Sequence, residues 1–225
     1  MTRIILVRHG FSEANVQHVF AGISDTPLCD IGHHQASAVA AYLCANEKID
    51  KIYTSDLQRV IDTVSPTAKA LGLTPIKDAG LREINGGLWE GMPFDDIALG
   101  YERDFHTWKH DTANARPTGG ESVREVYERI VPHIKRLASE NEGKTILLGS
   151  HWTTIRALLA YVLTGTHESI GMAEQAPSHG NDASAPTVKN ASLHILTYEA
   201  GTLTPVKLDI TEHLSNLDTN NKKSL

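Results

Sequence analysis

The stretch Ile4-Ile5-Leu6-Val7-Arg8-His9-Gly10 decides how the rest of this chain is interpreted. Its four consecutive apolar residues are mostly β-branched, which predicts a short strand that is buried on both faces. A cation, an imidazole and a glycine follow the strand directly. A strand that ends in such residues is typical of a chain that binds a ligand at a sheet edge.

The same junction between a buried strand and polar residues recurs twice. Residues 51–54 lead into Ser55-Asp56-Leu57-Gln58-Arg59, and residues 145–149 lead into Ser150-His151. In open α/β sheets, ligands bind at the carboxyl ends of parallel strands. If these three strands are parallel neighbours, one edge gathers Arg8, His9, Arg59 and His151. Since guanidinium suits bidentate recognition of phosphate or carboxylate, the sequence predicts an anion site there.

Helices and further strands fill the intervals. Helical spacing of apolar residues predicts helices over 27–46, 57–71, 122–137 and 153–163, and short strands are predicted at 74–77, 191–198 and 205–210. Ser55 and Asp56 are suitable N-caps for the second helix, Pro66 should bend or restart it, and Ile31 should lie on the buried face of the first. This alternation predicts an α/β fold with a mostly parallel sheet and an antiparallel pair near the C-terminus.

Two segments lie outside this alternation. Residues 84–118 hold five of the 13 aromatic residues, Trp89, Phe94, Tyr101, Phe105 and Trp108, which predicts a small, mainly helical cap insertion. Residues 165–190 have no periodicity and predict a long functional loop. We expect one domain over 1–218 and a disordered tail over 219–225. The cap and the loop are the candidates for substrate selection.

Composition excludes several classes of partner. Lys plus Arg is 21 and Asp plus Glu is 27 in the 225 residues, giving a formal charge of −6. This balance argues against nucleic acid or an anionic membrane as the partner. The apolar stretches are too short to span a bilayer, and the N-terminus has no signal-peptide core, so we expect a cytoplasmic protein.

The sequence gives no sign of a metal site. Cys29 and Cys44 lack metal-ligand spacing, and His106 and His110 have no glutamate between them as a zinc-protease motif requires. We therefore expect no metal.

Phosphate monoester chemistry fits the predicted anion site. An imidazole can act as a nucleophile, and arginines can neutralise the oxygens of a transferring phosphoryl group. A carboxylic acid is still needed to protonate the leaving oxygen. Glu83 follows a predicted strand, but local sequence does not separate it from Glu13, Glu90 or Glu121.

Six blocks in order resemble the histidine phosphatase superfamily, the phosphoglycerate-mutase-like proteins. The blocks are Arg8-His9-Gly10-Phe11-Ser12-Glu13-Ala14-Asn15, Leu28 to Ala36, Ser55 to Thr63, Leu81-Arg82-Glu83-Ile84 through Trp89-Glu90-Gly91, Gly119-Gly120-Glu121-Ser122, and Ser150-His151. One such motif alone would be weak evidence, but six in family order are strong. The resemblance implies a three-layer α/β fold with a mostly parallel central sheet.

The resemblance also implies a role for each matched residue. His9 would be the phosphorylated nucleophile and Glu83 the proton donor, with Arg8, Arg59 and His151 binding phosphate. The substrate-binding groups would be Ser12, Asn15, the backbone near Ala21 and Gly22, and Trp152. No metal or organic cofactor is implied. The expected partner is a small-molecule phosphate ester, and a homodimer stays open.

Three residues depart from the family pattern; Phe11 and Trp152 bear on substrate identity and leave alternatives open, whereas Cys29 is interpreted as a change in packing. Phe11 stands where Glu or Gln is usual, Trp152 replaces the customary glycine, and Cys29 replaces Ser or Thr. The main hypothesis is a phosphatase. A phosphoglycerate mutase would use the same phosphohistidine, and a catalytically weak regulatory protein would keep only the binding site.

Overall fold

The centre of the molecule is a six-stranded sheet in the order β3-β2-β4-β1-β5-β6. The computed structural model describes residues 1–171, 186–215 and 217. The strands are β1 (Thr2–Arg8), β2 (Lys51–Thr54), β3 (Ile76–Lys77), β4 (Thr145–Ser150), β5 (Leu193–Glu199) and β6 (Thr202–Ile210). β1, β4, β2 and β3 are parallel, whereas β5 pairs antiparallel with both β1 and β6. The predicted sheet is therefore confirmed.

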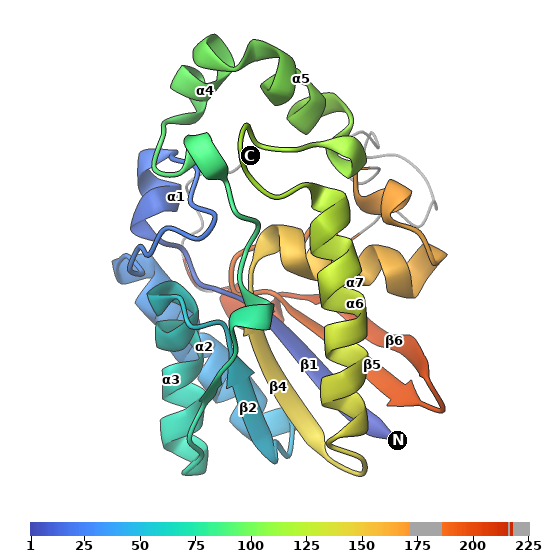
Figure 1. Cartoon of the computed structure of the whole chain (residues 1–225). Coiled ribbons are helices and arrows are strands. Elements are labelled where there is room, and N and C mark those ends of the chain that lie inside the picture. Colours follow the sequence, from blue (N-terminus) through green and yellow to red (C-terminus); the bar gives the residue numbers. More distant parts are fainter. Residues whose placement is uncertain (172–185, 216, 218–225) are drawn as a thin grey trace.

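Helices cover both faces of this sheet (Figure 1). They are α1 (Glu13–Gln17), α2 (Asp30–Asn46), α3 (Gln58–Leu71), α4 (Phe94–Gly100), α5 (Glu102–His110), α6 (Val123–Ser139) and α7 (Trp152–Thr164). Short 3₁₀ turns lie at Ala79–Leu81, Gly87–Trp89, Thr112–Asn114, His167–Gly171 and Glu212–Leu214. No helix in the described part of the chain is both long enough and apolar enough to cross a membrane.

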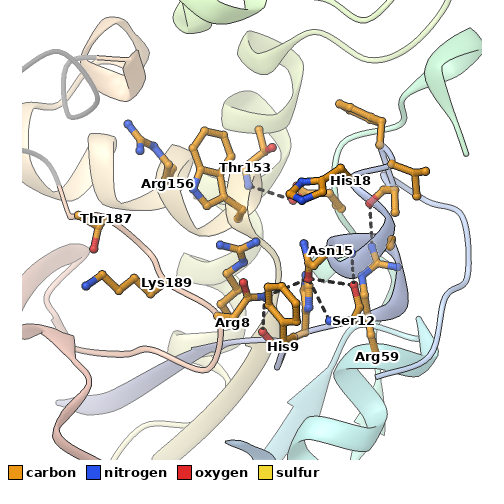
Figure 2. Close-up of a pocket in the computed structure, with 18 of the residues that line it drawn as sticks. Arg8, His9, Ser12, Asn15, His18, Arg59, Thr153, Arg156, Thr187 and Lys189 are labelled. Atoms are coloured by element: carbon orange, nitrogen blue, oxygen red, sulfur yellow. Dashed lines mark hydrogen bonds between the residues drawn. The ribbon is translucent and has the colours of Figure 1, made fainter. Parts of the chain in front are cut away.

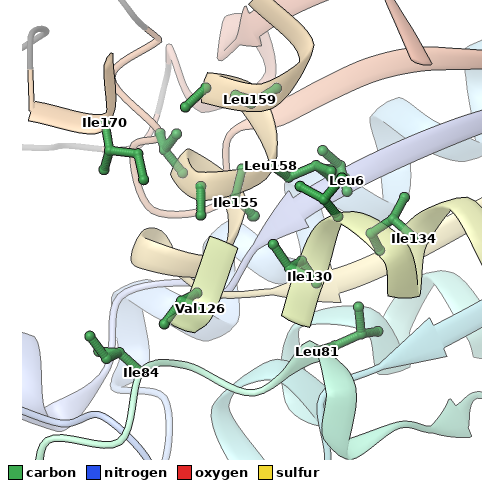
Figure 3. Packing of buried hydrophobic residues seen from close by; sticks show 14 of the residues in the cluster. Leu6, Leu81, Ile84, Val126, Ile130, Ile134, Ile155, Leu158, Leu159 and Ile170 are labelled. Atoms are coloured by element: carbon green, nitrogen blue, oxygen red, sulfur yellow. The ribbon is translucent and has the colours of Figure 1, made fainter. Parts of the chain in front are cut away.

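Alternation along β1 builds two separate cores. Ile4 and Leu6 join the cluster formed with α6 and α7, part of which is drawn in Figure 3. Ile5 and Val7 point the other way and join the cluster formed with α2 and α3. Successive side chains of a strand face opposite sides of the sheet, so an unbroken apolar run needs cover on both sides. The predicted three-layer α/β fold is confirmed.

Some expectations about single residues of α2 and α3 were wrong, because these side chains make contacts with distant parts of the chain. Helix α3 begins at Gln58 and has no side-chain cap, since Ser55 bonds to His151 and Asp56 forms an ion pair with Arg82. Ile31 is 39% exposed rather than buried. Pro66 lies inside α3 without ending it. In contrast, Ser122 does cap α6, in a capping box with Glu125.

The segment 84–118 contains α4 and α5, which lie beyond the sheet at the top of Figure 1. Its centre is Trp89, which is fully buried. Phe20, Phe105 and Trp108 meet Trp89 edge-on, at ring centroid distances of 5.6, 6.1 and 5.9 Å. Such edge contacts contribute about 0.5–1.5 kcal/mol each beyond area burial. The aromatic residues of the segment thus form a small core of their own, which Phe20 ties to the rest of the chain.

Two expectations fall wholly or partly outside the described residues. Of the loop 165–190, the structure describes 165–171 and 186–190. The predicted tail over 219–225 lies entirely outside them.

Candidate active site

Three parallel strand ends meet at one edge of the sheet. Arg8 at the end of β1 is in register with Ser150 of β4, and Thr54 at the end of β2 is in register with Gly149. His9 and His151 follow these ends, and their ring centroids are 5.3 Å apart. A pocket of about 1050 Å³ opens here and extends to the aromatic residues of the cap. Figure 2 shows Arg8, His9 and Arg59 together at its base.

His9 is held as a neutral ring with one nitrogen available. Its Nδ1 donates to the carbonyl oxygen of Gly10 at 2.7 Å, because a carbonyl can only accept. The tautomer with hydrogen on Nδ1 leaves a lone pair on Nε2. Burial lowers the pKa of His9 well below the ordinary value, and the charges of Arg59 and Arg8 lower it further. The ring is therefore unprotonated at neutral pH, and a neutral imidazole is chemically able to act as a nucleophile.

His151 lies behind this ring and is fully buried, so it does not line the pocket. Its Nε2 is 2.9 Å from the Ser55 hydroxyl, and no described residue bonds its Nδ1. Burial, followed by the charges of Arg59, His9 and Arg8, lowers the pKa of His151 well below its usual value. An incoming anion would offset that electrostatic cost, because it opposes the charge of the arginines.

Arg59 and Arg8 are positive charges held by carbonyl oxygens. Arg59 is 1% exposed and donates to the carbonyls of Ser24 at 2.8 Å, Gly22 at 2.7 Å and Ala21 at 3.2 Å. Arg8 donates to the carbonyl of Val188 at 2.9 Å. Burial lowers the pKa of both, that of Arg8 to about 10, so both stay charged at pH 7. A buried cation without a carboxylate bond favours an anionic ligand.

Glu83 is the one of the four candidate acids that lines the pocket. Its carboxylate accepts the N–H groups of Ile84 at 2.9 Å, Thr153 at 3.0 Å and Thr154 at 3.3 Å. The last two belong to the first turn of α7, whose N–H groups have no partner within the helix and are satisfied by Glu83. Glu90 bonds to the backbone of 23–24 and Gly86 instead, and Glu121 pairs with Arg129 at 2.6 Å.

Ser12 and Asn15 line the pocket at the start of α1, where they form a capping box. The Ser12 hydroxyl donates to Asn15 Oδ1 at 2.9 Å. Asn190 adds a second amide, which the sequence analysis did not assign to the site. Its Nδ2 donates to the carbonyl oxygen of His9 at 3.2 Å and to Asn15 Oδ1 at 3.3 Å. No local pattern marks Asn190, since it comes from a distant loop.

The remaining predicted substrate groups differ in placement. Ala21 lines the pocket, but Gly22 does not, and its carbonyl is turned toward Arg59. Trp152 lines the pocket with the Arg156 guanidinium over its ring at 4.6 Å. Sequence reasoning also missed four pocket-lining residues with basic side chains, His18, Lys109, Arg156 and Lys189.

Two curated relatives cover different shares of the chain. Phosphoserine phosphatase 1 of Hydrogenobacter thermophilus is 32% identical over 214 residues, which is 95% of this chain and 95% of that protein. A bifunctional protein of Mycobacterium tuberculosis is 37% identical over 165 residues, or 72% of this chain. The chain matches 44% of the length of that mycobacterial protein.

A solved structure and a family profile extend the comparison. The mycobacterial glucosyl-3-phosphoglycerate phosphatase is 27% identical and superposes with a TM-score of 0.78, covering 93% of this chain and 99% of the other. The sequence profile of the histidine phosphatase superfamily (branch 1) matches residues 4–211. With that match over nearly its whole length, and with His9 and His151 next to each other at adjoining strand ends, the chain belongs to the histidine phosphatase superfamily.

Proposed function

We propose that the chain is a phosphatase that hydrolyses a small-molecule phosphate monoester through a phosphohistidine at His9. The observation that carries the proposal is the buried, neutral His9 ring, whose Nδ1–H is fixed by Gly10 while Arg8 and Arg59 stand beside it. A neutral imidazole can attack phosphorus, and the arginines neutralise the phosphoryl oxygens, a role that Mg²⁺ plays in other phosphoryl-transfer sites.

In the first step, the Nε2 lone pair of His9 forms a bond to phosphorus and the phosphorus–oxygen ester bond breaks. Protonated Glu83 gives its proton to the leaving oxygen, so the alcohol departs neutral. The imidazolium that forms keeps its Nδ1–H bond to Gly10 at 2.7 Å. We assign Arg8 and Arg59 to the charge on the phosphoryl oxygens, and we assign His151 to the same role once ligand binding opens its buried ring to the pocket.

In the second step, the Glu83 carboxylate takes a proton from water and the water oxygen attacks phosphorus. The phosphorus–nitrogen bond breaks, its electron pair returns to Nε2, and inorganic phosphate leaves. The bonds from Ile84, Thr153 and Thr154 hold the carboxylate in one orientation for both transfers. Glu83 is thus the acid of the first step and the base of the second, so it is protonated again at the end of the cycle.

The names of the relatives support a phosphatase. One is a phosphoserine phosphatase and another a glucosyl-3-phosphoglycerate phosphatase. Besides the residues of the reaction centre, the pocket is lined by aromatic residues of the cap such as Phe94 and Trp108 and by cations such as Lys109 and Lys189. We assign substrate selection to these residues of the cap and the late loop.

The test is His9→Ala, with His34→Ala on the exposed side of α2 as the matched control. We expect wild type and control to hydrolyse p-nitrophenyl phosphate and some members of a sugar-phosphate panel. His9→Ala should lose at least about a thousandfold in kcat, since removing a nucleophile removes the covalent route. Comparable turnover by His9→Ala would refute the mechanism.

The same preparations separate the two alternatives. Efficient conversion of 3-phosphoglycerate to 2-phosphoglycerate with little phosphate release would identify a mutase instead. Orthovanadate binding without turnover on any ester of a broad panel would identify a binding protein.

A further inference from the structure

The loop of residues 21–24 holds Arg59 by turning three of its carbonyl oxygens toward the guanidinium. Ala21, Gly22 and Ser24 each accept a hydrogen bond from the guanidinium. Neighbouring peptides of an irregular loop do not turn their carbonyls toward one point unless something fixes the loop. The position of Arg59 therefore depends on what holds residues 21–24.

Glu90 holds that loop. Its Oε1 accepts the N–H of Ile23 at 2.9 Å and that of Gly86 at 2.7 Å. Its Oε2 accepts the N–H of Ser24 at 2.9 Å and also the Ser24 hydroxyl. Hydrogen bonds to an ionised acceptor are roughly twice as strong as those between neutral groups. One carboxylate thus fixes both peptide N–H groups on the side of the loop opposite to Arg59.

The Glu90 carboxylate is packed closely against Gly22 and Gly86. A Cβ on Gly22 would collide with Glu90 Oε1 and with the carbonyl of Ile84, and a Cβ on Gly86 would meet Glu90 Oε1 at 2.9 Å. Glu90 itself does not line the pocket. It acts on Arg59 through the loop and through the attraction between its charge and the guanidinium, which raises the pKa of Arg59 against the larger lowering by burial.

We propose that Glu90 is a positioning residue, which fixes the 21–24 loop so that Arg59 is held ready for a phosphoryl oxygen. The proposal rests on the proposed function for the role of Arg59. Glu90 also belongs to the first part of the cap segment, so its bonds to Ile23 and Ser24 attach the cap to the loop that holds Arg59. Loss of the carboxylate would free the loop, and the guanidinium would have to be ordered when the ligand binds.

The test is a double-mutant cycle of Glu90→Gln and Arg59→Ala, with Glu128→Gln on the exposed face of α6 as a charge-matched control. The readouts are the dissociation constant of orthovanadate and kcat/KM on p-nitrophenyl phosphate. A glutamine presents an NH₂ group to N–H donors, so it cannot replace all four bonds. We expect Glu90→Gln to weaken orthovanadate binding at least tenfold, and the control to leave it within twofold.

The decisive comparison is the effect of Glu90→Gln in the Arg59→Ala background. We expect less than a threefold further loss there, since the residue that Glu90 positions is gone. An equal loss in both backgrounds would overturn the proposal. Should Glu90→Gln fail to fold, Ser24→Ala removes one of the four bonds and should show a smaller loss that also disappears with Arg59→Ala; no loss would contradict the proposal.

The two proposals fail in different ways. A wild type that binds orthovanadate but hydrolyses no ester would contradict the phosphatase, while the binding cycle would still decide the role of Glu90.

Discussion

Arg8 and Arg59 differ from the arginines around them in what they bond. Arg82 and Arg129 each bind a carboxylate, that of Asp56 at 2.5 Å and that of Glu121 at 2.6 Å. Arg8 and Arg59 donate to backbone carbonyls, which orient a guanidinium without cancelling its charge. Arg8 and Arg59 therefore keep their attraction for an anion, and little conformational entropy is lost in positioning them when it binds.

Gly22→Ala should damage the site without removing a functional side chain. The added methyl would collide with the carbonyl of Ile84 and with Glu90 Oε1, so the loop must move and take its carbonyls away from Arg59. We expect a loss of about 1–3 kcal/mol in stability, as for other overpacked sites, and a fall of at least tenfold in kcat/KM. Urea unfolding and p-nitrophenyl phosphate kinetics measure both. Gly100→Ala, where a Cβ meets nothing within 4 Å, is the control.

Strand β5 connects the anion site to the far edge of the sheet. His194 of β5 is fully buried beside Leu6 of β1, and its Nδ1 accepts the N–H of Asp209 in β6 at 3.2 Å. The Asp209 carboxylate accepts the N–H of Thr187 at 3.1 Å, next to the Val188 carbonyl that bonds Arg8. The neutral His194 ring, which bonds the backbone of the neighbouring strand β6, thus supports residues 187–188, and the Val188 carbonyl orients Arg8.

Acidification should therefore destabilise the fold through His194. Burial lowers its pKa to about 4, whereas the unfolded chain binds this proton near pH 6.5. The unfolded state then binds more protons as the pH falls from 6.5 toward 4, so stability is lost in that range. From pH 7 to pH 5, we expect His194 to contribute about 2 kcal/mol of the loss.

Urea unfolding at the two pH values checks this for wild type and for His194→Gln, which does not titrate. The variant should lose about 2 kcal/mol less than wild type between pH 7 and pH 5, whatever its stability at pH 7. Exposed His34→Gln should behave as wild type. An equal pH dependence in all three proteins would contradict the assignment.

At the scale of the whole molecule, the pocket joins two different surfaces. The sheet edge supplies cations and imidazoles, and the cap supplies rings that pack on Phe20, Trp108 among them at 5.4 Å. The net charge of −6 is therefore unevenly distributed, with positive groups gathered where the anion is expected. Repulsion of the ligand by the remaining surface is screened within about 10 Å at 0.1 M salt.

Trp108→Ala should change the ranking of substrates more than the chemistry. Trp108 lines the pocket from α5 of the cap, whereas His9 lines it from the sheet edge, so esters with a bulky or aromatic leaving group should lose at least about tenfold in kcat/KM, and small esters little. Kinetics on p-nitrophenyl phosphate and glycerol phosphate, with thermal melting as a check on folding, test this. Leu99→Ala, on a residue that is 86% exposed, should leave the ranking unchanged. A uniform loss on all esters would argue against selection by the cap.

The amino-acid sequence by itself determined the family, the three-layer fold and the residues that follow the three parallel strands. These features follow from apolar runs, helical spacing and short motifs, which depend on residues a few positions apart. Its local forecasts failed where distant groups compete for a side chain. Ser55 could have capped α3, yet it bonds His151, and Ile31 could have been buried, yet it lines the pocket.

Only the tertiary structure decided which glutamate faces the pocket and which holds a loop. Glu83 and Glu90 lie in the same motif, but one carboxylate reaches the first turn of α7 and the other reaches residues 23–24. Asn190 likewise contacts His9 across 181 positions of sequence. Contacts between residues so far apart in sequence depend on how the layers of the fold pack. No local pattern contains that information, because the entropy of closing the loop between two such residues depends on its length far more than on its sequence.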